Sequence, residues 1–498
     1  MARIAVIGAG MGAMAAAARL AVAGHRVTVY ERSATHGGAV GRFERDGFRF
    51  DTGPGLLHLP AVWRDLFVKT GKEPLEQCVE LVQVDPASRH LFADGTDATL
   101  PNVSRAGIVS ALDTALGAGA GERWGEFLGR ARDAWDRSRR PLLEEPLPAD
   151  RARVAQDPYP ALRQGLMRRT ARTLGEVGSR ELRDPRLAAL LDSHALAYGL
   201  DPRSAPASAA VLPYMEQTFG SWYVKGGIRA LADAVYERCV ARKVEFVFGA
   251  AVTEVLEKDG RAVGLGLEHD GPVEADLVVA GAPVPALFRD HVVPWVRQDE
   301  WPAWQSTVRT GRVTVLLALR GARPAESVHR TVVHAADSAA EWDAIAAGRP
   351  ARRPTVTVLR PDDPLLRPDD AHETVTLTAT VPAELEGEDS WAAAADAFAD
   401  RMVEAARAAV PDLRDRILWR EVRTPADTGR DTGVREVPAP ALAGARGALL
   451  PASNSSSTPG LYFAGGWSHP GGGLPHAGMS GALVAGLIVE GAAFRGSQ

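Results

Sequence analysis

Residues 2–31, ARIAVIGAGMGAMAAAARLAVAGHRVTVYE, contain in order an apolar run, a glycine-rich turn, a helical stretch and a second apolar run. Residues 2–7 are typical of a buried parallel strand. Residues 14–22 are rich in Ala and predict a helix, and residues 26–30 predict a second strand that ends at Glu31. This order predicts a βαβ unit of the kind that binds a dinucleotide.

The turn between the first strand and the helix has the residue types that a bound pyrophosphate requires. Gly8 allows a tight turn, Gly10 lets the backbone approach the phosphates, and Ala13 allows close packing of helix on strand. Gly12 completes the turn, and the helix after it would direct free N–H groups and its dipole at the phosphates. Glu31 follows about twenty residues after the turn, where an acid accepts hydrogen bonds from the ribose of an ADP group.

The bulk properties of the chain exclude several classes of protein. A length of 498 residues predicts two domains or more. The net charge of −5 gives no reason to expect nucleic-acid binding. Because Cys78 and Cys239 are the only cysteines, we expect no disulfide framework, and a reducing, cytoplasmic compartment fits. No apolar run of about 18 residues occurs, so we expect no membrane span, while peripheral contact with a membrane stays open.

The middle of the chain predicts further strands and helices without a second fingerprint. Helical spacing marks 122–138 and 161–173, which flank a connection at 137–160 rich in Pro and charge. The segment 116–121, LGAGAG, follows a helical stretch and not a strand, so it predicts a loop and no second nucleotide site. A Gly-Gly pair then opens a second α/β block with a helix at 228–242. The other predicted strands are 244–248, 251–258, 261–268, 276–280, 313–319, 355–359, 374–380 and 461–464, and the other predicted helices are 391–410 and about 476–491.

Five segments of the chain resemble one family. They are 8–38 (GAGMGAMAAAARLAVAGHRVTVYERSATHGG), 47–57 (GFRFDTGPGLL), 184–207 (DPRLAALLDSHALAYGLDPRSAPA), 213–235 (PYMEQTFGSWYVKGGIRALADAV) and 460–488 (GLYFAGGWSHPGGGLPHAGMSGALVAGLI). They are similar to segments of the phytoene-desaturase-like (carotenoid-desaturase-like) FAD oxidoreductases of the amine-oxidase superfamily. The resemblance covers nearly the whole chain.

The resemblance implies an α/β fold with two domains built from separated segments. A Rossmann-like FAD-binding domain would be assembled from the discontinuous segments 1–72, 222–288 and 440–498. An inserted, mixed α+β substrate-binding domain, which includes a helical lid, would comprise 73–221 and 289–439.

The same resemblance implies a set of FAD contacts. They are Gly8, Gly10, Gly12, Ala13, Glu31, Arg32, Gly38, Ala39, Arg42, Pro54, Gly55, Leu56, Val252, Gly465, Gly466, Gly473, Leu474 and Met479. The chain departs from the family at Ala39, where many relatives carry an arginine that contacts the FAD diphosphate; Arg42 is the nearest arginine after it. It departs again at 433–440, GVREVPAP, where relatives often have Gly-Gly and Tyr-Gly pairs. If this second segment lines the substrate cavity, the substrate need not be that of the family.

The glycine run near the C-terminus has a physical role beside a flavin. A reduced flavin carries negative charge over N1 and O2, which the N-terminus of a helix stabilises. Residues 471–475, GGGLP, open a predicted helix, and their glycines allow the backbone to lie close to the ring.

Few residues are candidates for moving protons. His469 is the best catalytic candidate because the C-terminal motif places it beside the ring, and Trp467 is expected to form part of the wall. Weaker candidates are His58, Tyr214, Glu216 and His476. No His, Cys or carboxylate cluster has metal spacing, so we expect no metal site.

By resemblance, the expected activity is desaturation of a lipophilic, carotenoid-like polyene. A hydride would leave the substrate for N5 of the flavin, and a proton would leave the neighbouring carbon. The developing cation is delocalised in an extended polyene, so a strong protein base is not required. The reduced flavin would pass its electrons to oxygen or a quinone. The sequence does not predict the oligomeric state.

Two other functions fit the same sequence. The first is a tailoring oxidoreductase, saturase or isomerase that acts on a polyene or polyketide secondary metabolite. The second is a non-catalytic lipid escort, because some relatives of this fold bind prenylated partners and have lost FAD. The intact Gly8, Gly10 and Glu31 argue against that loss.

Overall fold

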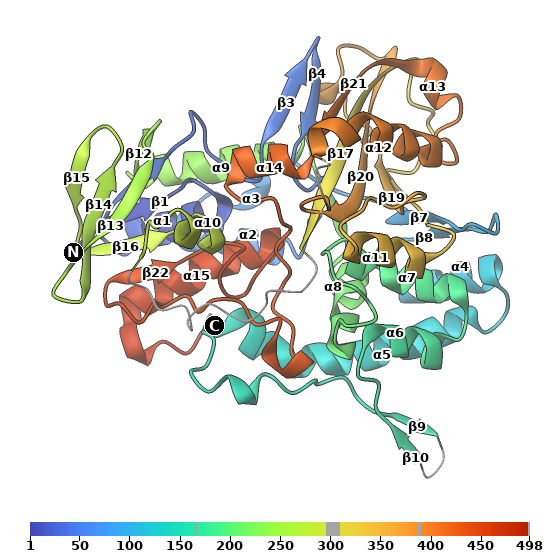
Figure 1. Cartoon of the computed structure of the whole chain (residues 1–498), viewed down its shortest axis with the longest axis horizontal. Helices are drawn as coiled ribbons and strands as arrows, with labels where there is room; N and C mark the ends of the chain where they lie inside the picture. Colours follow the sequence, from blue (N-terminus) through green and yellow to red (C-terminus); the bar gives the residue numbers. More distant parts are fainter. Residues whose placement is uncertain (165–166, 295–308, 387–389, 497–498) are drawn as a thin grey trace.

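The computed structural model describes residues 1–164, 167–294, 309–386 and 390–496 (Figure 1). A five-stranded parallel sheet, in the order β12, β2, β1, β16, β22, contains the N-terminal βαβ unit. Its strands are β1 (Arg3–Ile7), β2 (Arg26–Glu31), β12 (Glu245–Phe248), β16 (Leu277–Ala280) and β22 (Leu461–Phe463). The beginning, middle and end of the chain therefore build one sheet, which confirms the predicted α/β fold. The domain boundaries stay a prediction.

The first strand is buried on both faces, which explains its unbroken apolar sequence. Ile4 and Val6 pack with three helices on one face, and Ala5 and Ile7 pack with a small antiparallel sheet and a helix on the other. The helices of the first face are α1 (Met11–Val22), α9 (Ile228–Ala241) and α15 (Leu474–Glu490). The other face carries β13 (Val252–Lys258), β14 (Arg261–Leu267), β15 (Gly271–Glu274) and α10 (Val284–Arg289).

The helix α1 lies against both α9 and α15, and its alanines make this possible. Ala15, Ala16, Ala17 and Ala18 are all buried, because only small side chains let neighbouring helices approach from several sides. The helix begins at Met11 and not at residue 14. Gly10 already has the extended backbone of an N-cap, with φ −73° and ψ 166°.

A second, seven-stranded sheet belongs to the inserted segments. Its order is β21 (Ile417–Arg423), β17 (Thr310–Arg320), β20 (His372–Pro382), β19 (Val356–Leu359), β18 (Arg330–Val333), β7 (Ser88–Leu91), β8 (Asp97–Leu100). Side chains of β17 alternate between the two faces. Val315 and Leu317 pack under α12 (Trp391–Ala406), whereas Leu316 packs with Phe50 of the hairpin β3 (Arg42–Arg45) and β4 (Phe48–Asp51). The side of the sheet opposite α12 therefore contacts the segment that follows the fingerprint.

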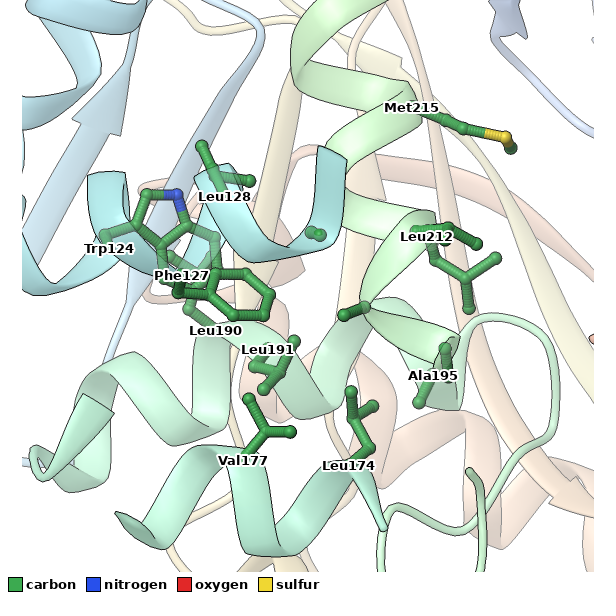
Figure 2. Packing of buried hydrophobic residues seen from close by; sticks show 14 of the residues in the cluster. Trp124, Phe127, Leu128, Leu174, Val177, Leu190, Leu191, Ala195, Leu212 and Met215 are labelled. Carbon is green, nitrogen blue, oxygen red and sulfur yellow. The ribbon is translucent and has the colours of Figure 1, made fainter. Parts of the chain in front are cut away.

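A group of helices completes the inserted part. They are α4 (Arg105–Leu116), α5 (Ala120–Arg139), α6 (Leu174–Val177), α7 (Pro185–Leu196) and α8 (Val211–Phe219). Figure 2 shows their shared apolar core, in which Trp124 and Phe127 of α5 lie over Leu190 and Leu191 of α7. The same core includes Met479 of α15, so the helical group packs directly on the C-terminal helix.

Shorter elements connect these parts. The strands are β5 (Leu57–His58), β6 (Leu81–Gln83) and β11 (Ser221–Val224), and the helices are α2 (Ala61–Thr70), α3 (Leu75–Cys78), α11 (Ser338–Ala346), α13 (Leu413–Arg416) and α14 (Pro425–Thr432). Single 3₁₀ or π turns lie at Arg140–Glu144, Arg151–Arg153, Gly178–Leu182, Ala207–Ala210, Pro364–Leu366, Ala445–Gly447 and Gly491–Ala493.

The prediction of a helix at 161–173 is wrong. The described residues of this segment form an antiparallel hairpin of β9 (Leu162–Gln164) and β10 (Met167–Arg169), which stands off the helical group in Figure 1. Helix begins only after Thr173, whose side chain accepts a hydrogen bond from the N–H of Glu176 and caps α6.

The predicted loop at 116–121 is confirmed, because α4 ends at Leu116 and α5 begins at Ala120. Among the described residues, none of the helices combines the length and the apolar character that crossing a bilayer demands.

Candidate functional site

The N-terminal turn leaves room for a ligand in front of the first helix. Gly8 has φ +86°, and its N–H donates to the carbonyl of Tyr30 at 2.8 Å. A Cβ atom on Gly10 would meet no atom within 4 Å. The first N–H groups of α1 have no intrahelical acceptor, and they face this open space with the positive end of the helix dipole. The turn is therefore shaped to bind an anion.

Glu31 is held at the carboxyl end of β2. Its Oε2 accepts from the N–H of Ala9 at 2.7 Å, and its Oε1 accepts from the N–H and the hydroxyl of Ser33, both at 2.8 Å. A carboxylate has about four lone-pair positions, so these bonds leave capacity for a further donor. The acid is oriented beside the turn, as a ribose-binding group requires.

The loop that follows β2 folds back over the turn. The N–H of Gly37 donates to the carbonyl of Ala9 at 2.8 Å, and a Cβ on Gly38 would stand 3.0 Å from the Cα of Gly10. Ala39 is exposed in this loop. The loop thus forms a second wall beside the glycine turn.

Arg229 holds this loop, and the sequence reasoning missed it. Its Nη1 donates to the carbonyl of His36 at 2.7 Å, its Nη2 to Thr35 Oγ1 at 2.9 Å, and its Nε to Asp233 Oδ1 at 2.7 Å. The side chain is buried, although it comes from the N-terminus of α9. A positive charge therefore stands behind the loop that carries Ala39. Its only signal in the sequence is its position after the second Gly-Gly pair.

Arg32 and Arg42, which the resemblance assigned to the cofactor, bond to protein groups here. Arg32 Nη2 donates to the carbonyls of Arg430 and Asp431 at 2.9 and 3.1 Å. Arg42 Nη2 donates to the carbonyl of Gly226 at 3.2 Å. Each fastens the fingerprint region to another segment.

Asp51 caps the helix α9. Its Oδ2 accepts from the N–H of Ile228 at 2.8 Å and its Oδ1 from the N–H of Arg229 at 3.1 Å. Burial raises the pKa of Asp51 to about 6, against the lowering effect of these two hydrogen bonds. The residues after it include Pro54, Gly55 and Leu56. A Cβ on Gly53 would stand 2.3 Å from the carbonyl oxygen of Ala39, so this segment lies against the loop behind which Arg229 stands.

The two ends of the chain meet at the turn. A Cβ on Gly12 would stand 2.6 Å from the Cα of Gly465, and a Cβ on Gly481 would stand 2.5 Å from the carbonyl oxygen of Gly12. The hydroxyl of Ser480 accepts from the N–H of Gly465 at 2.9 Å. Backbone contacts between glycines thus bring α1, α15 and the turn after β22 together (Figure 1). Gly466 follows in the same turn.

The glycine run 471–473 opens α15, as the sequence predicts. Gly473 is the N-cap with φ +110°, and Leu474 begins the helix. The N–H of Gly472 donates to the carbonyl of Ala439 at 2.8 Å, and a Cβ on Gly472 would stand 1.8 Å from the carbonyl oxygen of Pro438. The segment 433–440, where the chain departs from its family, is therefore in contact with this run.

His469 is fully buried beside the glycine run. Its Nε2–H donates to the carbonyl of Glu145 at 2.9 Å, and its Nδ1 has no hydrogen-bond partner among the described residues. Burial lowers its pKa to about 4, and the pKa of the buried His476 is lowered to about 4 for the same reason. The Nδ1 of His476 is also without a partner in the described part of the chain. Because its Nε2–H donates to a carbonyl, His469 has an Nδ1 that can only accept, which fits a ligand that presents a hydrogen-bond donor beside the glycine run.

Other predicted residues have apolar surroundings. Trp467 is buried in the cluster that includes Val434 and Phe463, and Met479 is buried in the core of the helical group. Ala13 packs against Gly281, because a Cβ added to Gly281 would stand 2.4 Å from the Cβ of Ala13. Val252 begins β13, close to Ala250, whose N–H donates to the backbone carbonyl of Glu31.

The described residues contain no group of three or more His, Cys, Asp or Glu side chains arranged to hold a metal ion. The residues brought together here are the anion-binding turn at the start of α1 and the glycine turn after β22, which are in backbone contact through Gly12 and Gly465. An anion-binding turn of this kind fits the diphosphate of a dinucleotide.

Comparison with known proteins gives the chain a family. The profile of the flavin containing amine oxidoreductases matches residues 14–489. The chain is 29% identical over 500 residues to a 4,4'-diapolycopene oxygenase of Methylomonas sp., with 98% of each chain covered. It is 32% identical over 292 residues to a zeta-carotene-forming phytoene desaturase of Myxococcus xanthus, with 59% of this chain and 55% of the relative covered.

Among solved structures, an oxidoreductase from Methanosarcina mazei is similar with a TM-score of 0.64 and 16% identity, covering 97% of this chain and 99% of the other. At this identity the similarity shows the fold.

Proposed function

This chain belongs to the flavin containing amine oxidoreductase family and is a phytoene-desaturase-like, flavin-dependent enzyme; on that premise we propose that it uses FAD to desaturate a lipophilic, carotenoid-like polyene. The observation that carries the proposal is that Gly12, at the start of α1, is in backbone contact both with Gly465 of the turn after β22 and with Gly481 of the glycine-capped helix α15. The family membership leaves the non-catalytic lipid escort without support.

We assign the two ends of FAD to different groups of residues. The ADP end would be held by the first turn of α1, by Glu31 and by the loop behind which Arg229 stands. The ring end would lie between the segment 54–56 and the glycine run 471–473. When bound, the flavin accepts a hydride at N5. The N–H groups at the start of α15 would then stabilise the negative charge of the reduced ring.

The side chains around a small cavity of about 20 Å³ beside the glycine run suit an apolar ligand, although the cavity itself is too small to hold a polyene. The cavity lies between α5, α8 and the segment that precedes the glycine run, and His476 reaches it from α15. Most of its walls are apolar: Trp135, Leu142, Leu143, Val211, Leu212, Met215 and Leu442. The two relatives named above, a phytoene desaturase and a diapolycopene oxygenase, also support a long polyene as substrate.

We propose that a hydride leaves the polyene for N5 of the flavin while a proton leaves the neighbouring carbon. The enzyme would position the chain and exclude water. Oxygen or a quinone would reoxidise the flavin. Since a polyene of this kind dissolves in lipid, we further propose that the protein collects it by peripheral contact with a membrane.

A specific observation favours a tailoring enzyme as the alternative function. The segment 433–440 departs from the family pattern and packs on the glycine run. A tailoring oxidoreductase, saturase or isomerase that acts on a polyene or polyketide secondary metabolite would need such a change near the ring.

The first measurement releases the cofactor from purified protein and determines its molecular mass, which distinguishes FAD from FMN. The holoprotein is then incubated with phytoene-type polyenes and with polyene polyketides, and products are analysed by mass. Loss of hydrogen supports desaturation, gain of hydrogen supports a saturase, and an unchanged mass with a new spectrum supports an isomerase. Turnover of neither substrate class by protein with intact FAD would contradict the proposal.

A further inference from the structure

A partly buried polar cluster lies beside the segment that carries the proposed ring site. It consists of Glu216 of α8, Arg330 of β18, His194 of α7 and His58 of β5, and we call it the Glu216 cluster. Arg330 Nη2 donates to Glu216 Oε1. His194 Nε2 lies 3.8 Å from Glu216 Oε1, and His58 Nε2 lies 3.9 Å from Glu216 Oε2. One carboxylate therefore faces a guanidinium and two imidazoles.

The backbone determines which nitrogen of each imidazole carries its hydrogen. His194 Nδ1 lies 2.9 Å from the carbonyl of Leu190, and His58 Nδ1 lies 3.3 Å from the carbonyl of Gly220. A carbonyl can only accept, so both Nδ1 atoms are donors. In the neutral rings, both Nε2 atoms then present lone pairs to the carboxylate of Glu216. The distances of 3.8 and 3.9 Å are too long for hydrogen bonds.

The Glu216 cluster thus contains several hydrogen-bond acceptors, the carboxylate of Glu216 and the Nε2 atoms of His58 and His194, which together can bind one further proton. A cavity of about 10 Å³ lies beside His194 and Glu216. This is close to the smallest volume that holds one water molecule, and a water there would donate to both groups. The cluster is built to take up a proton that arrives from outside.

The charges of the cluster favour such uptake. Burial opposes ionisation of Glu216, but Arg330 and then His194 hold the pKa of its carboxyl well below its usual range. Burial lowers the pKa of His58, while the charge of Glu216 raises it in part. At neutral pH an ionised carboxylate therefore stands beside a neutral imidazole. His90, whose pKa burial also lowers, is the next titratable group and bonds to Ser88 and His334 at 2.9 Å each.

The strand β5 connects the cluster to the proposed ring site. The strand β5, which carries His58, packs against both α15 and α8 and begins directly after Leu56. The hydroxyl of Tyr198 lies 3.8 Å from the position of a Cβ on Gly473. Burial and then the charge of Glu216 raise the pKa of Tyr198, so its hydroxyl stays protonated beside the glycine run at neutral pH.

We propose that the Glu216 cluster accepts the proton that desaturation releases, with His58 Nε2 as the acceptor and Glu216 stabilising the imidazolium. The inference rests on the proposed function. One C–H bond of the polyene breaks with its electron pair leaving as hydride to the flavin. The neighbouring C–H bond breaks, its electron pair forms the new double bond, and its proton passes to His58. The flavin is reduced by two electrons, and the substrate is oxidised by two.

The first test observes the cluster without substrate. The holoprotein is labelled with ¹⁵N-histidine, and long-range ¹H–¹⁵N correlations report the tautomer and pKa of His58, assigned with the variant His58→Asn. We expect the Nδ1–H form at neutral pH and a lower His58 pKa in Glu216→Gln. The matched control is Glu181→Gln, because Glu181 is likewise bonded to an arginine, Arg130, but no histidine in the described part of the chain lies within 4.0 Å of its carboxylate. An Nε2–H tautomer, or a His58 pKa unchanged in Glu216→Gln, would overturn the proposal.

The second test measures reduction of the bound flavin by a phytoene-type polyene, without oxygen and with a pH-indicating dye. Wild-type protein should retain the proton when its flavin is first reduced. His58→Asn and Glu216→Gln should reduce the flavin about 100-fold more slowly, the lower end of what a positioned base contributes. Glu181→Gln should match wild type.

The outcomes of the second test separate the two proposals. Wild-type rates in both His58→Asn and Glu216→Gln would overturn the proton acceptor and leave the desaturase intact. No reduction of flavin in wild-type protein would overturn the desaturase, and the proton acceptor with it. His58→Asn preserves the pair of Glu216 and Arg330, so it tests the idea even if Glu216→Gln does not fold.

Discussion

The Cα of Gly465 lies 2.6 Å from the position that a Cβ on Gly12 would occupy, although the two glycines belong to opposite ends of the chain. Real Cβ atoms essentially never approach another atom so closely. The first turn of α1 and the turn after β22 are therefore in backbone contact, and no side chain fits between them.

The first prediction concerns this contact. We expect Gly12→Ala to lower the free energy of unfolding by about 1–3 kcal/mol, because the added methyl group must displace the backbone of Gly465. Bound flavin should fall with it. Chemical denaturation and the ratio of flavin to protein absorbance measure the two effects.

Gly10→Ala is the matched control for Gly12→Ala. Its Cβ would meet no protein atom within 4 Å, so we expect stability within about 1 kcal/mol of wild type. The methyl group would instead occupy space in front of α1 and reduce flavin binding. Full flavin content in Gly10→Ala would mean that the pyrophosphate lies elsewhere.

The second prediction concerns Glu31. Glu31→Ala removes the acceptor of the N–H groups of Ala9 and Ser33, and we expect loss of bound flavin together with about 1–3 kcal/mol of stability. Glu31→Gln keeps one acceptor oxygen and should fold better while binding flavin weakly. Flavin retained through gel filtration is the measurement. If Glu31→Ala retained all its flavin, the dinucleotide fingerprint would have been misread.

The third prediction separates Arg229 from Arg42. Arg229→Lys keeps the charge but cannot reach His36, Thr35 and Asp233 together, so we expect weaker flavin binding and a lower melting temperature. Arg42→Lys loses one bond, to the carbonyl of Gly226, and should behave nearly as wild type. The dissociation constant of FAD, measured with the apoprotein of each variant, tests this prediction. If Arg42→Lys lost more affinity for FAD than Arg229→Lys, Arg42 and not Arg229 would be the arginine that serves the diphosphate.

The fourth prediction is a pH dependence of stability. The unfolded chain protonates His476 near pH 6.5, whereas burial lowers the folded pKa to about 4. The neutral ring therefore contributes stability that is fully present above pH 6.5 and is lost as pH falls towards 4. A shift of this size corresponds to about 3 kcal/mol.

His476→Gln should flatten the fall in unfolding free energy across this pH range. The control is His269→Gln, because His269 stands on an exposed turn and its removal should leave the slope unchanged. Denaturant midpoints measured across the pH range test both variants. An identical slope in His476→Gln and wild type would mean that folding does not lower the pKa of His476.

Local patterns were sufficient for the order of the elements. The apolar runs and the glycine turn predicted β1, α1 and β2 because hydrophobic period and backbone permissiveness act over a few residues. The glycines before α15 predicted its N-terminus for the same reason. The prediction of a helix at 161–173 is wrong, because the segment contains a hairpin and helix begins only after the cap Thr173. Apolar spacing alone does not distinguish a helix from a strand in a short segment.

The sequence by itself determined the fold class and the flavin family, and it predicted which segments meet at the cofactor. Only the tertiary structure decided which side chains act together. Arg229 came to stand behind the Ala39 loop, Asp51 became the cap of α9, and His58 came to face Glu216. Each is a contact between residues more than a hundred positions apart in the chain. Such contacts depend on how sheets and helices pack, and short-range sequence patterns carry no information about them.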